Sequence, residues 1–312
     1  MFRKTRIALA ALLIGTMVSP LWAAEATTVN IGYQKANIFA LLKSRATLDE
    51  RFKQQGVTVK WVEFPAGPQM LEGLNVGSID LAATGDAPPV FAQAAQADLV
   101  YLAHSPANPQ SEAIVVHADS PIKSVADLKG KRVALNKGSD VNYLLVAALE
   151  KAGLSYKDIT PVYLPPADAR AAFQSKSVDA WVIWDPFLAE VETNAQARQV
   201  ANAEGLVPHY SFFLASRKFA DGSPKLAKEV VEELQTLSQW ANGHQNDAAA
   251  ILAKSTGLDE AIWRKAIARI PYGAEPMTPA IFKEQQKLAD SFTRIGLLPV
   301  SIDVSKASWQ QK

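Results

Sequence analysis

The chain has no cysteine and only four histidines among its 312 residues. Without cysteine it forms no disulfide and offers no thiolate ligand to a zinc or redox centre. The histidines lie far apart, at positions 104, 117, 209 and 244, so we expect surface or structural roles for them. We therefore predict no metal and no cofactor, and a stability that rests on the burial of a hydrophobic core.

An excess of basic residues is also missing, because 32 Lys and Arg face 31 Asp and Glu. Nucleic-acid binding requires clustered basic residues that neutralise phosphates, so the composition excludes a nucleic-acid partner. The enzyme patterns G-x-S-x-G, H-E-x-x-H, G-x-G-x-x-G and the Walker A loop are absent as well. The sequence thus favours a binding protein and keeps an enzyme only as the weaker alternative.

The first 24 residues have the pattern of a secretory signal peptide. Arg3, Lys4 and Arg6 precede an apolar run at positions 7–18, and small residues follow near Ala24. The run is shorter than the roughly 20 apolar residues that a membrane-spanning helix needs, so we favour a cleaved signal over an anchor. Cleavage is expected after Ala24 or Ala26. Removing residues 1–24 takes three positive charges from a net +1 and leaves about −2.

Two stretches about a hundred residues apart share one pattern. They are FPAGPQMLEGLNVGSIDLAATGDAPPVFAQAA at positions 64–95 and LPPADARAAFQSKSVDAWVIWDPFLAE at positions 164–190. Each reads as the end of a strand, a proline-bearing turn, an amphipathic helix, a buried strand and a loop that opens on Asp and Pro. In this alignment Asp80 corresponds to Asp179, and Asp86 corresponds to Asp185. Positions 31–42 and 134–145 repeat in the same order, so we predict two lobes of one type.

Hydrophobic periodicity predicts strands that alternate with helices, which is typical of parallel α/β sheets. The expected strands are 28–32, 57–64, 79–83, 99–103, 113–116, 131–135, 160–164, 180–183 and 212–215. The expected helices are 37–48, 68–75, 88–97, 124–128, 141–152, 167–174, 224–240, 247–254, 259–269 and 279–295. We predict a fold of two α/β lobes, each a mostly parallel sheet flanked by helices, with a ligand cleft between them. Lobe 1 comprises residues 27–110, lobe 2 comprises residues 111–210, and residues 211–312 return to lobe 1 and add C-terminal helices.

Ligands of parallel sheets collect where strands end and helix N-termini begin, and four such junctions are expected to meet in the cleft. They are 33–37, 84–86, 136–140 and 184–186, and they contain the candidate ligand-binding residues Tyr33, Gln34, Thr84, Gly85, Asp86, Gly138, Ser139, Asp140, Trp184 and Asp185. Gly138 and Ser139 have the chemistry of an anion cradle, while an ordinary capped turn is the alternative. Asp86 and Asp185 have helix capping as an alternative role. Trp181 is expected in the core, and Trp184 either there or in a ligand wall.

Several of these segments resemble one known family. IGYQK (31–35), WVEFPAGPQMLE (61–72), LNVGSIDLAATGDAPPVFAQAAQADLVY (74–101), SPIKSVADLKG (120–130), PADARAAFQ (166–174) and VDAWVIWDPF (178–187) are similar to segments of the periplasmic aliphatic sulfonate-binding proteins of ABC importers. The resemblance implies a monomeric periplasmic protein that closes on a small organosulfonate and delivers it to an inner-membrane permease for sulfur uptake. Because their side chains are apolar, we expect Tyr33 and Trp184 to form a wall for the carbon tail of such a ligand. A taurine-like zwitterion or another anion is the alternative ligand.

Asp140 departs from the pattern of this family, in which a small hydroxyl residue tends to follow Lys-Gly-Ser. A carboxylate that points into an anion site weakens anion binding. We favour an Asp140 that points away and caps the following helix, where an acidic residue is stabilising. The alternative is an Asp140 that faces the cleft and accepts a cationic or hydroxylated part of the ligand.

Overall fold

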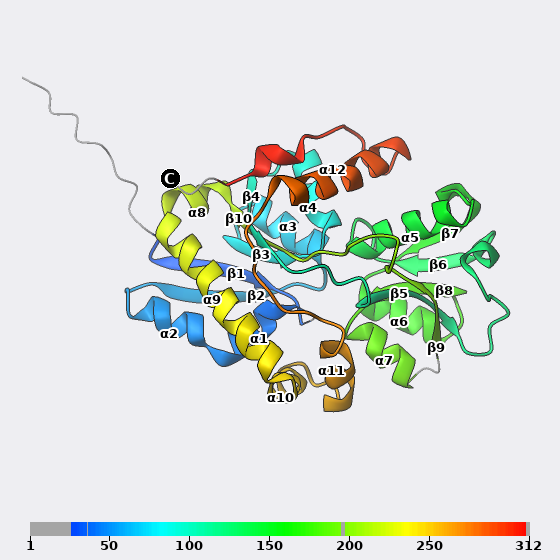
Figure 1. Ribbon diagram of the computed structural model, residues 1–312, viewed down its shortest axis with the longest axis horizontal. Coiled ribbons are helices and arrows are strands. Elements are labelled where there is room, and N and C mark those ends of the chain that lie inside the picture. The colour runs from blue at the N-terminus through cyan, green and yellow to red at the C-terminus, as the bar shows by residue number, and fades with distance from the viewer. Residues whose placement is uncertain (1–25, 36, 195–196, 310–312) are drawn as a thin grey trace, which may run out of the picture.

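The structure is a computed structural model that describes residues 26–35, 37–194 and 197–309. The predicted signal peptide at residues 1–24 lies outside these ranges. Among the helices of the described residues, none is long and apolar enough to cross a membrane. Figure 1 shows two groups of strands with helices packed around each, joined by segments that run between them.

Two five-stranded sheets have the same strand order. The first runs β2-β1-β3-β10-β4, and the second runs β7-β6-β8-β5-β9. The bounds are β1 Thr28–Tyr33, β2 Thr58–Glu63, β3 Leu81–Thr84, β4 Leu99–His104, β5 Glu112–His117, β6 Arg132–Leu135, β7 Thr160–Tyr163, β8 Ala180–Trp184, β9 Ala197–Asn202 and β10 Phe212–Ser216. Each sheet is parallel except for its fourth strand, β10 or β5, which runs antiparallel to both neighbours. The prediction of two mostly parallel lobes is therefore confirmed.

The predicted repeat has a counterpart in the hydrogen bonds that start the central strands. The carboxylate of Asp80 accepts a bond from the backbone N–H of Asn30 at 2.8 Å, which ties β3 to β1. The carboxylate of Asp179 accepts the equivalent bond from Arg132 at 2.7 Å, which ties β8 to β6. These aspartates therefore set the register of the two copies, and the alignment of positions 80 and 179 reflects one shared structural role.

Helices cover both faces of the first sheet. They are α1 Ile38–Arg45, α2 Thr47–Lys53, α8 Arg217–Gly222, α9 Pro224–Gly243, α10 Gln245–Thr256 and α11 Glu260–Ile267 on one hydrophobic cluster, and α3 Gly67–Asn75, α4 Ala87–Ala94 and α12 Pro279–Arg294 on another. The second sheet is flanked by α5 Asp140–Lys151, α6 Pro166–Gln174 and α7 Phe187–Asn194. Short 3₁₀ turns lie at Val125–Leu128, Tyr156–Asp158 and Val304–Ala307.

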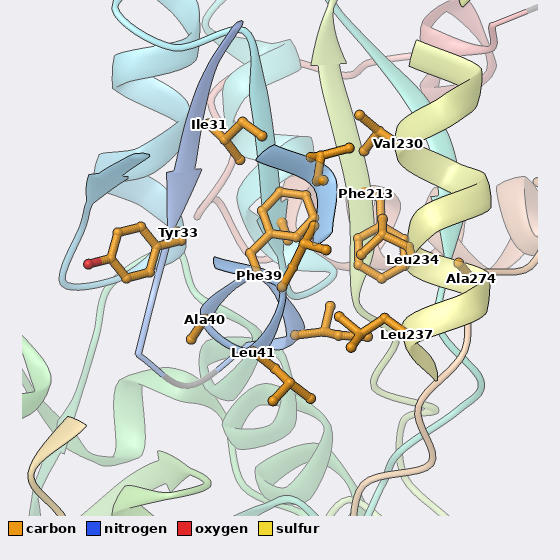
Figure 2. Close-up of a cluster of buried hydrophobic side chains, with 14 of the residues drawn as sticks. Ile31, Tyr33, Phe39, Ala40, Leu41, Phe213, Val230, Leu234, Leu237 and Ala274 are labelled. Carbon is orange, nitrogen blue, oxygen red and sulfur yellow. The ribbon is translucent and has the colours of Figure 1, made fainter. Parts of the chain in front are cut away.

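The core of lobe 1 contains the side chains of strands and helices that are distant in sequence. Figure 2 shows Ile31 from β1, Phe39 from α1, Phe213 from β10 and Leu234 from α9 packed together. Each of these side chains is almost completely buried. The apolar run of each strand and the apolar stripe of each helix therefore meet in one cluster, which supplies the stability expected of a chain without disulfides.

The chain passes between the two sheets twice, after β4 and after β9. The two crossing segments, residues 105–111 and 203–211, are hydrogen-bonded to each other. The backbone N–H of Ser105 donates to Ser211, and that of Asn108 donates to His209. We keep the predicted limits 27–110, 111–210 and 211–312 as working definitions of lobe 1, lobe 2 and the returning segment.

Four local features differ from the expectations. One helix was expected at 37–48, but Ala46 adopts a left-handed conformation with φ of 55° and separates α1 from α2. Gly243 was expected just beyond the end of α9, but it is the last residue of the helix, and His244 is the C-cap. Strand β9 and helix α8 were not predicted. Each is only six residues long and lacks a clear apolar period, so its packing against larger elements decides its structure.

Candidate functional site

A cleft lies between the lobes and is lined by residues from both. Lobe 1 contributes Gln34, Thr84 and Gly85, lobe 2 contributes Asp140, Trp184 and Asp185, and the crossing segments contribute Ser105, Asn108, Ser111, His209 and Ser211. Pro271, Tyr272 and Gly273 close one side. Six of the ten predicted site residues therefore line one cleft. Tyr33, Asp86, Gly138 and Ser139 do not line it.

Tyr33 serves the structure of lobe 1. Its hydroxyl donates to the carboxylate of Glu63 at 2.9 Å and accepts from the ammonium group of Lys43 at 3.0 Å. Figure 2 shows this hydroxyl pointing away from the neighbouring core side chains. These contacts do not support its predicted place in a ligand wall. Trp184 does line the cleft and is 8% exposed, whereas Trp181 is buried in the core of lobe 2 as predicted.

The expected anion cradle at the start of α5 uses its donors internally. The backbone N–H of Gly138 donates to the side-chain oxygen of Asn142 at 3.1 Å. The hydroxyl of Ser139 donates to the backbone carbonyl of Asn136 at 2.7 Å. Gly138 has φ of +74° and lies against Phe91 of lobe 1. This loop therefore positions α5 and contacts the opposite lobe, and its paired donors do not face the cleft.

Asp140 faces the cleft, so the expectation that it points away is wrong. It is the first residue of α5, and its carboxylate reaches the backbone of Gly85 in lobe 1. A Cβ atom built on Gly85 would lie 2.7 Å from Cγ of Asp140. Glycine is therefore required at position 85 in this arrangement of the lobes, because any larger residue would collide with the carboxyl group.

Asp140 belongs to a buried charge cluster that also contains Glu112 and His209. The Nδ1 atom of His209 lies 2.9 Å from the Oε2 atom of Glu112 and 3.5 Å from the Oδ2 atom of Asp140. Glu112 is completely buried, and neither of its carboxylate oxygens has a hydrogen-bond partner of good geometry among the described residues. Burial alone would lower the pKa of His209, but attraction to Glu112, Asp140 and Asp86 raises that pKa to about 10. The imidazole is therefore a cation at neutral pH.

The carboxyl groups of this cluster are correspondingly perturbed. Burial raises the pKa of Asp140 to about 6, against the opposing attraction of His209. Asp86 adjoins the cluster from the start of α4, and burial raises its pKa well above the ordinary value. The expectation that Asp86 caps α4 is wrong, since its side chain makes no capping bond and its Oδ1 atom has no partner in the described part of the chain. It adds a further buried carboxyl group behind the cleft.

Asp185 belongs to a second charge cluster, which is better compensated than the first. The Oδ1 atom of Asp185 accepts a bond from the backbone N–H of Ala189 at 2.9 Å, so it caps α7 as one of the two expected roles. Its Oδ2 atom lies 3.5 Å from the guanidinium of Arg269, which also pairs with Glu192. Lys265 lies 2.9 Å from Glu192. Burial raises the pKa of Asp185 to about 7, and Arg269 opposes this shift.

Both rims of the cleft hold the lobes together. At one rim, the α11 region of lobe 1 contacts α7 of lobe 2 through Arg269 and Glu192. At the other rim, Arg294 of α12 lies 2.8 Å from Glu150 of α5, and the rings of Phe292 and Tyr143 meet edge to face at 5.8 Å. The structure therefore represents a closed arrangement of the lobes.

Sequence reasoning missed His209 and Glu112. His209 was expected to be a surface or structural residue, and Glu112 begins a strand that reads as ordinary buried β-structure. Each directly adjoins a predicted crossing point between the lobes. Both crossing segments contribute to the cleft wall. An acidic residue beside one crossing and a basic residue beside the other, Glu112 and His209, were therefore the available signal of a buried ion pair.

The cluster has the spacing of a metal site, since one donor atom from each of Glu112, Asp140 and His209 lies within 4.8 Å of the others. A metal ion requires an imidazole nitrogen with a free lone pair. A bound metal ion would have to displace the proton that the raised pKa of His209 places on this nitrogen. We therefore interpret the three residues as an ion-pair cluster and not as metal ligands.

The rest of the cleft wall is uncharged and combines polar side chains with apolar ones such as Ile38 and Phe213. Its polar groups include the amides of Gln34 and Asn108 and the hydroxyl of Ser211. The hydroxyls of Thr84, Ser105 and Ser111 also line the cleft, but each donates to a backbone carbonyl in this structure. The Oδ1 atom of Asn108 is buried without a partner in the described residues, and a flipped amide would present its NH₂ group there instead. Neutral donors of this kind bind a permanent anion without a titrating partner. The arrangement can therefore hold an anionic head group between the lobes, with Trp184 beside an apolar tail.

Comparison with known proteins places this chain among binding proteins. Residues 22–256 match the NMT1-like family. An Escherichia coli (strain K12) protein that bears the name aliphatic sulfonates-binding protein is 42% identical over 307 residues, which are 98% of this chain and 96% of the relative. A taurine-binding periplasmic protein of the same organism is 29% identical and aligns with 66% of this chain and 63% of its own length.

Solved structures agree with this placement. The alkanesulfonate-binding protein SsuA from Xanthomonas axonopodis pv. citri, bound to MOPS, superposes with a TM-score of 0.87 at 44% identity and covers 92% of this chain and 99% of its own. The periplasmic aliphatic sulphonate-binding protein SsuA from Escherichia coli gives 0.83 at 42% identity, with coverage of 92% and 94%. The chain therefore belongs to the NMT1-like family and, within it, to the group of the aliphatic sulfonate-binding proteins.

Proposed function

We propose that this protein binds an organosulfonate in the cleft between its lobes and delivers it to an ABC permease. The single observation that carries the proposal is a closed cleft whose wall comes from both lobes and contains uncharged polar side chains, among them Gln34, Asn108 and Ser211. The names of the 42% and 44% identical relatives support the ligand class. The absence of recognised enzyme patterns from the sequence agrees with a role in binding rather than catalysis.

The chemistry of a sulfonate fits this wall. The group is a permanent anion with three acceptor oxygens, so amides and hydroxyls can donate hydrogen bonds to it without changing their own protonation. Gln34 and Thr84 come from lobe 1, Trp184 comes from lobe 2, and Asn108 comes from a crossing segment. A ligand that touches both lobes favours the closed state over the open state by its differential contacts. Closure is then the signal that a permease reads.

Export supports the same role. The predicted signal peptide and the periplasmic relative point to a periplasmic protein that works beside an inner-membrane permease. We expect it to work as a monomer, because each chain carries both lobes and a complete cleft wall. Size-exclusion chromatography with light scattering tests the oligomeric state. Mass spectrometry of the exported protein tests cleavage after Ala24 or Ala26.

A zwitterionic sulfonate is a second candidate ligand, and Asp140 favours it. Its carboxylate faces the cleft and is an acceptor for an ammonium or hydroxyl group of the ligand. MOPS, the molecule in the Xanthomonas structure, is itself a sulfonate that carries an amine. The simple alkanesulfonate and the zwitterion share the head-group site and differ only in what lies beside Asp140.

A calorimetric panel tests the proposal and separates the two ligands. Ethanesulfonate, hexanesulfonate, taurine, MOPS, sulfate and nitrate are titrated into the mature protein in a buffer without a sulfonate group. We expect one binding site per chain for at least one organosulfonate and weaker binding of sulfate and nitrate. Trp184→Ala should weaken hexanesulfonate more than ethanesulfonate, while Trp240→Ala, which changes a tryptophan that does not line the cleft, should change neither. Binding of none of the sulfonates, or turnover of any of them, would contradict the proposed function.

A further inference from the structure

The cleft wall carries more negative than positive side chains. Asp140 and Asp185 line it, and Asp86 and Glu112 are buried next to them. The positive groups that face these four carboxyls are His209 and Arg269, with Lys265 behind Glu192. An anion that enters among fully ionised carboxylates meets uncompensated negative charge in a medium of low dielectric. Binding of a sulfonate there requires a compensating positive charge.

The imbalance is confined to one of the two clusters. In the cluster of Asp185 and Glu192, Arg269 and Lys265 together offset the two carboxylates. The cluster around His209 has one imidazolium against the three carboxyl groups of Asp86, Glu112 and Asp140. Tyr101 and Tyr143 are the other titratable groups near Asp86, and burial raises the pKa of both, so they stay neutral. No second cation compensates this cluster among the described residues.

The cluster also contains carboxylate oxygens that an added proton could satisfy. Both carboxylate oxygens of Glu112 and the Oδ1 atom of Asp86 are buried without a hydrogen-bond partner among the residues that the structure describes. A protonated carboxyl group becomes a donor and can satisfy such an acceptor. In the closed arrangement the backbone of Gly85 lies against the carboxyl group of Asp140, whose side chain is only 12% exposed. Closure therefore penalises the ionised form of Asp140.

We propose that sulfonate binding in this cleft is coupled to the uptake of about one proton by the cluster of Asp86, Glu112, Asp140 and His209. The inference rests on the proposed function and deepens it, because ligand and proton enter together as a neutral pair. Asp140 is the principal acceptor, since it is the one carboxyl group of the cluster that lines the cleft. The raised pKa of Asp140, about 6, already places it near neutral pH, and a sulfonate beside it raises that pKa further.

Calorimetry in several buffers measures the coupling directly. Ethanesulfonate is titrated into the mature protein at pH 7.0 in phosphate, imidazole and Tris, which differ in ionisation enthalpy, with a chelator present to remove metal ions. Sulfonate buffers are avoided because they compete for the site, and phosphate is titrated alone as a control. The slope of the observed enthalpy against the ionisation enthalpy of the buffer gives the number of protons taken up. We expect an uptake of roughly 0.5 to 1 proton per sulfonate bound. We also expect the Kd to weaken by up to about tenfold per pH unit above neutrality.

Matched variants assign the proton. Asp140→Asn should still bind ethanesulfonate and should take up far fewer protons, whereas Asp119→Asn, which changes an exposed carboxylate on lobe 2, should match the wild type. Asp86→Asn tests the second acceptor in the same way. Ethanesulfonate binding to the wild type with no proton uptake would overturn the inference, as would full uptake that survives in both cluster variants. Failure of the wild type to bind any sulfonate would contradict the proposed function instead.

Discussion

Asp86 and Asp185 occupy corresponding places in the two halves of the molecule and have different partners. Each follows a buried strand, precedes a proline-bearing helix start and is 3% exposed. Asp185 caps α7 and faces Arg269. Asp86 makes no capping bond, and its charged neighbours are His209, Glu112 and Asp140. The repeat therefore preserves the place of the carboxyl group, while the charge that compensates it comes from outside the repeat.

The comparison explains how a duplicated fold produces an asymmetric cleft. Arg269 comes from the C-terminal helical region, and His209 comes from a crossing segment. Arg269 compensates the carboxylates of Asp185 and Glu192 well. His209 alone does not compensate the carboxyl groups of Asp86, Glu112 and Asp140, so that cluster needs a further positive charge. The strand ends differ as well, since Thr84 and Gly85 are small whereas Trp184 is aromatic. One wall thus fits a polar head and the other an apolar tail.

Removal of the cation at the compensated end should have the largest effect. Arg269→Met leaves the carboxylates of Asp185 and Glu192 without their principal partner, and a broken buried pair costs about 3 kcal/mol of unfolding free energy. Urea unfolding of the mature protein measures this. Lys265→Met is the control, because its more exposed pair contributes at most about 1 kcal/mol. Equal losses in both variants would show that burial does not distinguish these two cations.

A methyl group at position 85 should impair closure. In Gly85→Ala the new Cβ would lie 2.7 Å from Cγ of Asp140, so the lobes or the carboxyl group must shift. Overpacking of this kind costs about 1–3 kcal/mol, which weakens the Kd for ethanesulfonate by about tenfold or more. The double variant Gly85→Ala with Asp140→Gly removes both close atoms, Cβ and Cγ of Asp140, and should recover most of the affinity. Titration calorimetry of the four proteins gives this coupling, and strict additivity of the two changes would argue against contact between the residues.

Removal of the cleft-facing carboxylate should improve the binding of simple alkanesulfonates. Asp140→Ser eliminates a negative charge beside the anion, so we expect ethanesulfonate to bind about threefold to tenfold more tightly at pH 7.5. Taurine, whose ammonium group can contact the carboxylate, should gain less or lose affinity. The ratio of the two Kd values in wild type and variant is the measurement. An unchanged ratio and unchanged affinities would mean that Asp140 does not influence the ligand.

The smallest expected effect is a change of stability with pH. The pKa values of Asp140 and Asp185, about 6 and about 7, lie above the ordinary value near 3.9 of an unfolded chain. The folded state therefore binds more protons, and this contribution is full below pH 4 and is lost as pH rises through 6 and 7. His209 acts in the same direction, with its contribution lost toward pH 10. Unfolding free energies between pH 5 and 7.5 should fall more steeply in the wild type than in Asp140→Asn; parallel curves would contradict the assigned pKa of Asp140.

The fold was largely predictable because its signals are local. The two copies of the strand-helix pattern each carry their own apolar periods, and Asp80 and Asp179 marked their alignment. The break at Ala46 was not predictable, since nothing around it signals a left-handed residue. Gly243 lies inside α9 as its last residue, so this glycine did not mark the position after the helix end.

The site was predictable in position and less so in chemistry. The strand ends that contain Gln34, Thr84 and Trp184 follow from the rule for parallel sheets. The orientation of Asp140 depends on how α5 packs against Gly85 of the other lobe. The sequence around Asp140 carries no information about that packing. His209 and Glu112 are 97 positions apart, and their pairing arises only because the two crossing segments lie side by side.

A crystal structure of the mature protein with ethanesulfonate or hexanesulfonate at pH 6.5 tests the central claim most directly. We expect closed lobes, the sulfonate oxygens within hydrogen-bond distance of groups from lobe 1 and from a crossing segment, and the carbon tail beside Trp184. The carboxyl group of Asp140 should remain next to His209. A sulfonate bound outside the cleft, or contacts with one lobe alone, would contradict the account.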